Sequence, residues 1–266
     1  MTDAARLEFA IDLAREAGAL ALEYFGQIRT LAITSKGPQD MASAADLAVE
    51  ELIKNRLAAA YPDDTFLGEE TGLAGETDGG IWVVDPIDGT QPFLSGLRSW
   101  CVSIAYVRDG RILLGVVFNP AADELFVGGR GVTATLNGQP IAPSPALSVA
   151  DGLTFLGYSS RIQPEQVVPV LDRLLRAGGM FVRSGSGALG LCDVACGRLV
   201  GYVEAHLNSW DGLGALAVCE AAGVRTNDYL TGDALLRGNH VVAGPPAVFD
   251  ELTSILGTAA ISGPGG

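Results

Sequence analysis

The segment 82-WVVDPIDGTQPFLSG-96 carries the strongest signal in the chain, because an apolar run in it stops at an acid. Trp82–Val84 predicts the end of a buried strand with Asp85 at its carboxyl edge, and Pro86 predicts a turn that returns Asp88 to its side. Two carboxylates this close repel unless a proton or a cation lies between them, and oxygen ligands of this kind suit Mg²⁺, Mn²⁺ or Ca²⁺ better than zinc. An Asp-Pro turn with the second acid in an Asx-turn is the structural alternative, and the segment alone leaves both open.

Gly89 and Thr90 come next, and they predict a place for an anion. Glycine lets a ligand approach the backbone closely, and Thr90 can open a helix whose free N–H groups and positive dipole end attract a phosphate. Helix capping by the threonine alone is the alternative. A strand, two acids, a glycine and a helix start together point to a metal and a phosphate in one place.

Three further acidic groups occur elsewhere, each with a purely structural alternative. In 68-GEET-71, one glutamate of an extended segment can point into a site, or both can lie in an exposed acidic loop. In 43-SAAD-46, Asp46 can serve a site or complete a helix-capping box. In 210-WDGLG-214, Asp211 can serve a site or stabilise the dipole of an apolar helix.

The composition predicts a globular protein that does not bind nucleic acid. Apolar residues make up 48% of the 266 residues and charged residues 18%, so a sizeable core can form. The net charge is −14 and no run of Lys or Arg occurs, which removes the usual basis for binding a phosphate backbone. The surplus acid can form a solubilising surface, or divalent cations can neutralise part of it.

The termini and the cysteines predict a cytoplasmic protein without membrane contact. The N-terminal MTDAARLEF lacks the basic and apolar regions of a signal peptide, and no apolar stretch reaches the roughly 20 residues of a membrane span. No CxxC motif occurs and the chain has two histidines, so a zinc site is not expected. Buried reduced thiols are expected at Cys101, Cys192, Cys196 and Cys219.

Hydrophobic periodicity predicts two helices, then strands, then an alternation of both. The expected helices cover 3–26, 43–60, 165–177, 187–196 and 210–222. The expected strands cover 81–84, 102–107, 112–118, 125–127, 154–156, 180–183, 200–203 and 240–243, with a hairpin at 108–111. Residues 137–152 are rich in Pro, Ser and Gly. We therefore expect an α/β fold with an N-terminal α+β domain over 1–145 and a C-terminal α/β domain over 146–266.

In this order, the motifs resemble those of the inositol monophosphatase family of metal-dependent, lithium-sensitive phosphatases. The family's first signature is similar to 82-WVVDPIDGTQPF-93 and its second to 210-WDGLGALAVCEAAG-223. Its upstream GEE motif is also present, and the acid of its helix matches Asp46, with Lys36 and Asp40 in the loop before it. The resemblance covers nearly the whole chain. It implies an αβαβα sandwich with two mixed sheets, metals between the two parts, and a homodimer.

The resemblance also implies a role for each residue of the site. The first of two or three Mg²⁺ ions, which Mn²⁺ can replace and Li⁺ should inhibit, would be bound by Glu69, Asp85 and the Ile87 carbonyl. The second would be bound by Asp85, Asp88 and Asp211. Catalytic roles would fall to Asp46, Thr90 and Glu69, with the first two orienting and deprotonating water. The substrate, a small phosphate ester, would be bound by Gly89, Thr90, Gly187, Glu204 and Asp211.

The implied mechanism is direct hydrolysis. Two cations about 3.5–4 Å apart can hold an attacking water and a leaving oxygen in line, so no phosphoenzyme is required. The chain departs from the family at Gln91-Pro92, Ala42-Ser43 and Ala222. Pro92 removes one amide of the helix start, although proline suits a first helical turn and the helix should survive. None of these departures removes a metal ligand.

The resemblance leaves the substrate open. Inositol 1-phosphate is expected because Glu204 suits a polyol, and histidinol phosphate is the first alternative because an acid can pair with its amine. Sugar phosphates, including fructose 1,6-bisphosphate, and 3′-phosphoadenosine nucleotides are further alternatives. Arg161 and Arg183 are isolated in the sequence, and the lack of a basic cluster weighs against a second phosphate. A non-catalytic role through contacts with proteins or RNA polymerase also stays open, although the intact acids argue against it.

Overall fold

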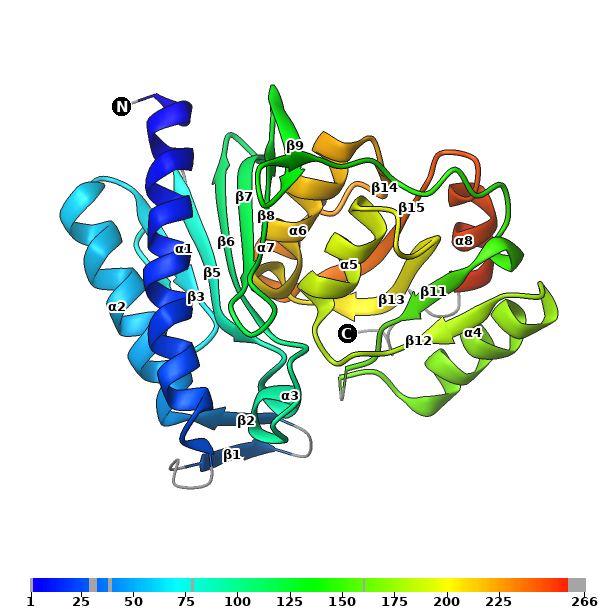
Figure 1. Cartoon of the computed structure of the whole chain (residues 1–266), viewed down its shortest axis with the longest axis horizontal. Coiled ribbons are helices and arrows are strands. Elements are labelled where there is room, and N and C mark those ends of the chain that lie inside the picture. The colour runs from blue at the N-terminus through cyan, green and yellow to red at the C-terminus, as the bar shows by residue number, and fades with distance from the viewer. Residues whose placement is uncertain (1, 29–32, 38–39, 78, 160, 258–266) are drawn as a thin grey trace.

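Helices and sheets alternate in layers along the molecule (Figure 1). The computed structural model describes residues 2–28, 33–37, 40–77, 79–159 and 161–257. At one side, α1 (Asp3–Phe25) and α2 (Ala44–Ala60) cover one face of a mixed sheet with the strand order β10-β9-β8-β7-β6-β5-β3-β4. Only β3 and β5 are parallel neighbours in it. Its strands are β3 (Thr65–Gly68), β4 (Gly72–Ala74), β5 (Ile81–Asp88), β6 (Cys101–Arg108), β7 (Arg111–Asn119), β8 (Glu124–Gly129), β9 (Val132–Leu136) and β10 (Gln139–Pro140).

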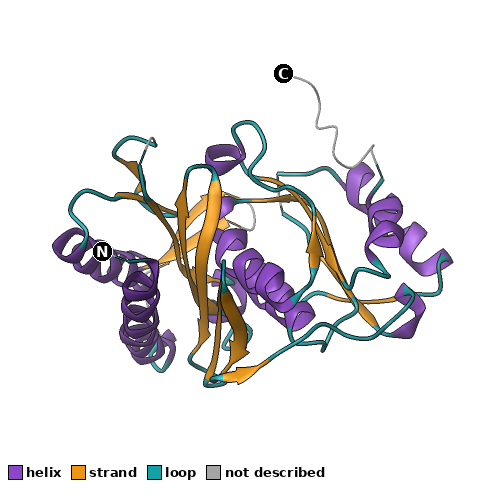
Figure 2. Ribbon diagram, turned by 90° about the horizontal axis from the view of Figure 1, so that it is seen from above, coloured by secondary structure: helices purple, strands orange, loops and turns teal. Residues whose placement is uncertain are grey.

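A second mixed sheet, with the order β12-β11-β13-β15-β14, forms the other half (Figure 2). Its strands are β11 (Leu153–Leu156), β12 (Met180–Val182), β13 (Gly201–Leu207), β14 (Arg225–Thr226) and β15 (Asn239–Gly244). Helices α5 (Gly187–Ala195) and α6 (Ser209–Ala222) lie between the sheets, and α4 (Pro164–Arg176) and α8 (Phe249–Leu256) cover the outer face. The remaining elements are β1 (Ile33–Gly37), β2 (Asp40–Ser43), α3 (Thr90–Leu94), a 3₁₀ turn (Val149–Asp151) and α7 (Ala234–Arg237). The expected αβαβα sandwich with two mixed sheets is confirmed.

Helix α6 packs very closely on the large sheet, and glycines make this possible. A Cβ atom at Gly115 in β7 would lie 2.0 Å from the carbonyl oxygen of Gly214, and one at Gly128 in β8 would lie 2.6 Å from the Cα of Val218. A methyl group at either position would push the helix off the sheet, because protein interiors are close-packed. Since Asp211 lies in the first turn of α6, this packing also fixes where its carboxylate lies.

Most of the expected elements are present, and their ends differ by a few residues. The hairpin is confirmed: Asp109 and Gly110 have φ angles of 53° and 66°, as a type I′ turn requires. Most of the expected strands are longer than predicted, and β5, β8 and β13 exceed the prediction most. Several short elements were not expected from the sequence, among them β1–β4, β10, β14 and α8.

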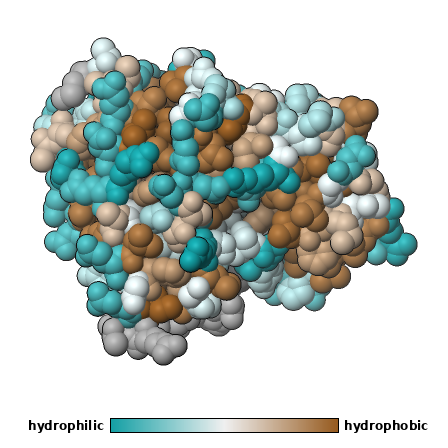
Figure 3. Space-filling model, viewed as in Figure 1, coloured by the Kyte–Doolittle hydropathy of each residue, from teal (hydrophilic) through white to brown (hydrophobic). Residues whose placement is uncertain are grey.

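Some expectations stay predictions. The division at residue 145 is not settled by the layers, because α5 and α6 from the second half pack between the two sheets. The side chains of Lys36, Asp40 and Ser43 lie outside the described part of the chain. The four cysteines are free, as expected, and three of them are buried, but Cys196 at the end of α5 is only partly buried. No helix among the described residues is long and apolar enough to cross a bilayer, and polar and apolar side chains are mixed on the face seen in Figure 3.

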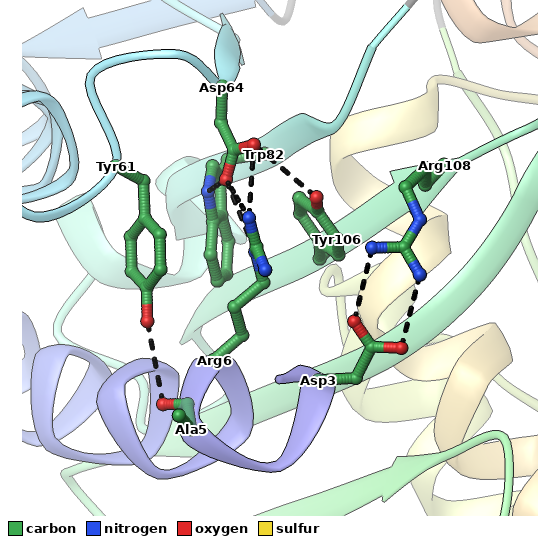
Figure 4. A network of polar contacts seen from close by, with 8 residues as sticks. All are labelled: Asp3, Ala5, Arg6, Tyr61, Asp64, Trp82, Tyr106 and Arg108. Carbon is green, nitrogen blue, oxygen red and sulfur yellow. Dashed lines mark hydrogen bonds and ion pairs between the residues drawn. The ribbon is translucent and has the colours of Figure 1, made fainter. Parts of the chain in front are cut away.

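A largely buried ion pair attaches α1 to the large sheet (Figure 4). The Arg6 guanidinium lies 3.1 Å from the Asp64 carboxylate, and their side chains are 11% and 9% exposed. Trp82 Nε1 donates a hydrogen bond to the same carboxylate at 3.1 Å, and the Tyr106 hydroxyl donates one at 3.4 Å. The guanidinium also lies 4.7 Å from the centroid of the Tyr106 ring. Asp64 therefore satisfies polar groups from a helix and two strands.

Replacing Asp64 by Ala should lower the free energy of unfolding by about 3 kcal/mol, because a buried guanidinium and an indole N–H lose their acceptor. Asp3→Ala is the matched control, since it removes the exposed Asp3–Arg108 pair seen in the same view and should cost no more than about 1 kcal/mol. Urea denaturation of the two variants measures both losses. Equal losses would contradict the structural role assigned to Asp64.

Candidate active site

Three acidic side chains from distant parts of the chain meet between the two halves. One carboxylate oxygen each from Asp85, Asp88 and Asp211 lies within 4.8 Å of the others. Asp85 is 1% exposed and Asp88 is 6% exposed. The sequence predicted that the two acids of β5 lie side by side, and the family resemblance implied that Asp211 joins them.

The way in which β5 brings its two acids together differs from the expectation. The strand does not end at Val84 but continues through Asp88. Asp85 pairs with Ser103 and Asp88 with Cys101, so three steps along β5 match two steps along β6. Residues three apart in a regular strand face opposite sides, and the extra residue of this β-bulge returns both acids to one side.

Proline suits this bulge. Pro86 has no N–H to give to the strand ladder, and prolines inside sheets are confined to edges and bulges. The Ile87 N–H donates a hydrogen bond of 2.9 Å to Asp85 Oδ1, which orients that carboxylate. A bulge is therefore what the Asp-Pro-Ile-Asp sequence encodes, in place of the turn expected from it.

Asp88 is held by the N-terminus of a helix from the other half of the chain. The Ser186 hydroxyl donates to Asp88 Oδ2 at 2.5 Å, and the Ala188 N–H donates to the same oxygen at 2.8 Å. The Gly187 N–H lies 3.3 Å from Asp88 Oδ1. Ser186 also caps α5, since its hydroxyl accepts from the Leu189 N–H. The sequence reading missed Ser186, although a serine just before an apolar helix is an N-cap pattern.

Asp211 has a structural role in α6 and also lies in the acidic cluster. It completes a capping box at the start of α6, where Asp211 Oδ2 accepts from the backbone N–H and the side-chain amide of Asn208 at 3.3 and 3.1 Å. It is also a member of the three-acid cluster. The capping bonds therefore fix the position of one carboxylate of the cluster.

Glu69 lies beside the cluster at the end of β3, in a loop that a buried acid holds in place. The Glu69 N–H donates to the Val84 carbonyl at 3.2 Å. Glu50 in α2, which is 1% exposed, accepts hydrogen bonds from the N–H groups of Glu70 and Thr71 at 2.9 and 2.8 Å. The sequence reading missed Glu50, because nothing in a helical sequence shows that a carboxylate will bind the backbone of a distant loop.

Thr90 lies between the strand and Asp46. Its hydroxyl is 3.4 Å from Asp46 Oδ1 and 3.3 Å from the Ile87 carbonyl oxygen. Helix α3 begins at Thr90, as expected, and Pro92 is inside it. Gly89 precedes the helix with a φ of 94°, and a Cβ there would lie 2.8 Å from the Ser99 carbonyl oxygen. Only glycine fits at this point.

These groups surround one cavity of about 450 Å³. Of the predicted site residues, it is lined by Glu69, Asp85, Ile87, Asp88, Gly89, Thr90 and Asp211. A recess of about 100 Å³ that shares part of this lining contains Gly187 and Glu204. Asp46 is fully buried behind Thr90 and does not line the cavity. Residues that the sequence reading did not place there also line it: Gln91, Tyr158, Ser159, Gly185 and Asn208.

Arg161 and Arg183 correct an expectation. They are isolated in the sequence, but both line the cavity that holds the acids. They come from two segments, after β11 and after β12, which are neighbouring parallel strands. Parallel neighbours place their carboxyl ends at the same edge of a sheet, which is why residues 22 positions apart in the chain reach one cavity.

The charges of the cluster call for a cation. Burial raises the pKa of Asp85 well above its usual range, and the charges of Glu69, Asp88 and Asp211 raise it further. Burial likewise raises the pKa of Asp88 and of Asp211. Three acids this close, two of them buried and Asp211 half-buried, can keep their charge only where a counter-ion is present, and carboxylate oxygens at this spacing fit a hard divalent cation. The residues present thus fit a divalent metal.

Comparison with known proteins agrees with this site. Residues 3–258 match the inositol monophosphatase family. The chain belongs to this family. Its members are phosphatases that hydrolyse phosphate monoesters and use divalent metals, so this protein is a phosphoric monoester hydrolase.

The relatives within the family carry different names. The chain is 36% identical to "Nus factor SuhB" of Xylella fastidiosa, over 84% of this chain and 82% of the relative. It is 35% identical to "Inositol-1-monophosphatase" of Mesorhizobium japonicum (92% and 93%) and 33% identical to "Histidinol-phosphatase" of Chlorobaculum parvum (94% and 96%). The crystal structure of the extragenic suppressor protein suhB from Bartonella henselae superposes with a TM-score of 0.89 at 31% identity, covering 96% of this chain and 99% of that one.

The buried acids predict that the metal-free protein loses stability as the pH rises. The pKa of Asp88 is raised from 3.8 to about 7, so the folded protein keeps a proton that the unfolded chain releases. The free energy of unfolding should therefore fall between about pH 4 and pH 7. Thermal unfolding with a chelator at pH 5.5 and 7.5 measures this. Mg²⁺ should raise the melting temperature more at pH 7.5, since protons compete with the cation, and an equal rise at both pH values would contradict a metal bound by these acids.

Ser186→Ala should weaken metal binding about 10- to 100-fold, because removing a hydrogen-bond donor to a metal ligand typically has an effect of this size. Ser184→Ala is the matched control: Ser184 lies two residues away, and its buried hydroxyl has no hydrogen-bond partner among the residues that the structure describes. The Mg²⁺ concentration for half-maximal activity measures the effect. If both variants shift it equally, the Ser186–Asp88 bond has no special role.

Proposed function

We propose that this protein is a Mg²⁺-dependent phosphatase of a small phosphorylated polyol, with inositol 1-phosphate as the best candidate. The observation that carries the proposal is the meeting of Asp85, Asp88 and Asp211 in the cavity where α3 begins. A cation site and a helix start at one cavity suit a phosphate ester. The names of the family and of the Mesorhizobium relative support inositol 1-phosphate.

The metal ligands in this proposal are those that the resemblance implied. One cation would be held by Glu69, Asp85 and the Ile87 carbonyl. A second would be held by Asp85, Asp88 and Asp211, and Glu69 would help to hold a third. When bound, such cations lower the pKa of water and stabilise negative charge on phosphoryl oxygens. Mn²⁺ should substitute for Mg²⁺, and Li⁺ should inhibit.

Other groups of the chain would orient the attacking water, accept its proton and bind the phosphate. The Thr90 hydroxyl lies between Asp46 and the Ile87 carbonyl, so it can orient a water and pass a proton to the Asp46 carboxylate. The N–H groups of Gly89 and Thr90 would bind the phosphate, where the left-handed conformation of Gly89 starts α3. No protein nucleophile is required, so we expect inversion of configuration at phosphorus.

Glu204 in the recess would bind the alcohol part of the substrate. Burial raises the pKa of Glu204 to about 8, and the Tyr202 hydroxyl donates a hydrogen bond to it. At neutral pH the acid is then mostly protonated, and it can both donate to and accept from a hydroxyl. Gly187, which lines the same recess, would leave room for the ring of an inositol substrate. Histidinol phosphate is the second candidate, because its charged amine could pair with the Glu204 carboxylate in place of the bound proton. The Chlorobaculum relative is also named a histidinol-phosphatase.

The remaining expectations belong to the same proposal. We propose a cytoplasmic homodimer, in keeping with the resemblance. Sugar phosphates and 3′-phosphoadenosine nucleotides are further candidate substrates. A binding role without catalysis is the alternative from a different class, and the presence of a "Nus factor" among the relatives keeps it in view.

Purified protein with Mg²⁺ should hydrolyse inositol 1-phosphate faster than histidinol phosphate or AMP. Asp88→Asn should lower kcat/KM by roughly a thousandfold, because the site loses a charge that a cation requires. Asp109→Asn, in the exposed hairpin, is the control and should leave the rate unchanged.

Full activity of the Asp88→Asn variant would show that the site is wrongly assigned. Retention of configuration at phosphorus would contradict direct hydrolysis. If no ester is hydrolysed with Mg²⁺, the non-catalytic role becomes the better explanation.

A further inference from the structure

Helix α2, which covers one face of the large sheet (Figure 1), carries two buried acids that reach two different segments of the cavity wall. Asp46 is fully buried and Glu50 is 1% exposed. The two acids are four positions apart, so they lie one turn from each other on the same face of the helix. Asp46 contacts the Thr90 hydroxyl at the start of α3, whereas Glu50 contacts the loop that follows β3.

Glu69 is the first of the three residues in this loop, which joins β3 to β4. Gly68 and Gly72 pair with each other at the ends of the two strands. The Glu69 N–H donates to the carbonyl oxygen of Val84 in β5 at 3.2 Å. Since Val84 directly precedes Asp85, this bond ties Glu69 to the strand that carries two acids of the cluster.

Glu50 binds the remaining backbone of the loop with both of its carboxylate oxygens. Its Oε2 accepts from the Glu70 N–H at 2.9 Å, and its Oε1 accepts from the Thr71 N–H at 2.8 Å. A glutamine at this position would offer one acceptor oxygen, and its NH₂ group would face the other N–H. The loop that starts with Glu69 is therefore held by β5 on one side and by α2 on the other.

The surroundings of Glu50 suit this one role. In the part of the chain that the structure describes, no ion pair joins Glu50 to a basic side chain. Lys54, one turn further along α2, lies with its Nζ 3.5 Å from the Thr71 hydroxyl instead. A Cβ atom at Gly68 would lie 2.5 Å from Glu50 Oε2, so the carboxylate fits against the loop only beside a glycine. Burying an acid in this way is costly, and the two N–H groups offset the cost.

We propose that Glu50 is a positioning residue that sets how tightly the cation between Glu69 and Asp85 is bound. The metal-binding role of Glu69 belongs to the proposed function, on which this role of Glu50 rests. Glu50 does not line the cavity, so it acts only through the loop that it holds. Removing a hydrogen-bond partner behind a metal ligand typically weakens metal binding about 10- to 100-fold.

Calorimetric titration of the metal-free protein with Mn²⁺ tests this role without turnover. Glu50→Gln should weaken one Mn²⁺ site roughly tenfold and leave the site of Asp88 and Asp211 within about twofold. Glu51→Gln is the matched control, because Glu51 is the exposed neighbour on the same helix, and it should leave every site unchanged. In a Glu69→Gln background, Glu50→Gln should add less than about a twofold loss, because both changes affect the same ligand.

Activity measurements separate positioning from general damage to the site. For Glu50→Gln, the Mg²⁺ concentration for half-maximal activity should rise roughly tenfold, whereas kcat at saturating Mg²⁺ should stay within about threefold of the wild type. A loss of kcat that Mg²⁺ does not restore would overturn the positioning role. Losses of Mn²⁺ affinity that simply add in the Glu69→Gln background would overturn it as well.

Gly68→Ala gives a second variant in case Glu50→Gln does not fold. Its methyl group would displace the same carboxylate, so it should weaken the same Mn²⁺ site, and unchanged binding would contradict the role of Glu50. If the wild type binds no Mn²⁺, the proposed function fails and the role of Glu50 fails with it. Tight binding that Glu50→Gln leaves unchanged overturns only the role of Glu50.

Discussion

Repulsion among buried carboxylates is the constraint on which the rest of the structure depends. Asp85 and Asp88, which are buried, and Asp211, which is half-buried, lie within a few ångströms of one another, and like charges this close are costly where water is largely excluded. Different hydrogen bonds fix each acid. Asp85 accepts one from within the bulge, Asp88 accepts from the N-terminus of α5, and Asp211 takes part in a capping box. The fold thus maintains an arrangement that the acids themselves disfavour, and a bound cation turns that cost into binding energy.

The same devices join the two halves of the molecule. Asp88 belongs to the large sheet, while the donors that hold it belong to α5, which lies between the sheets. The close glycine-mediated contact of α6 with β7 and β8 sets how far Asp211, in the first turn of α6, lies from the two acids of β5. Neither sheet alone contains the site. The three-acid cluster and the packing of the layers therefore depend on the same contacts, which explains why the position of the cluster follows from the fold as a whole.

The sequence revealed the acids more readily than their geometry. An apolar run that ends in two acids indicates a site, because buried strands seldom contain carboxylates, although the segment alone also allowed a plain Asp-Pro turn. It does not show a bulge, since the count of residues on the partner strand becomes known only when Ser103 and Cys101 are paired with Asp85 and Asp88. Short strands and α8 were missed for the same reason: their order depends on neighbours distant in the chain.

The arginines show most clearly where reasoning from sequence stops. A basic subsite was discounted because Arg161 and Arg183 stand 22 positions apart among uncharged or acidic neighbours. Charge in a folded protein is set by position in space, and β11 and β12 deliver both residues to one edge.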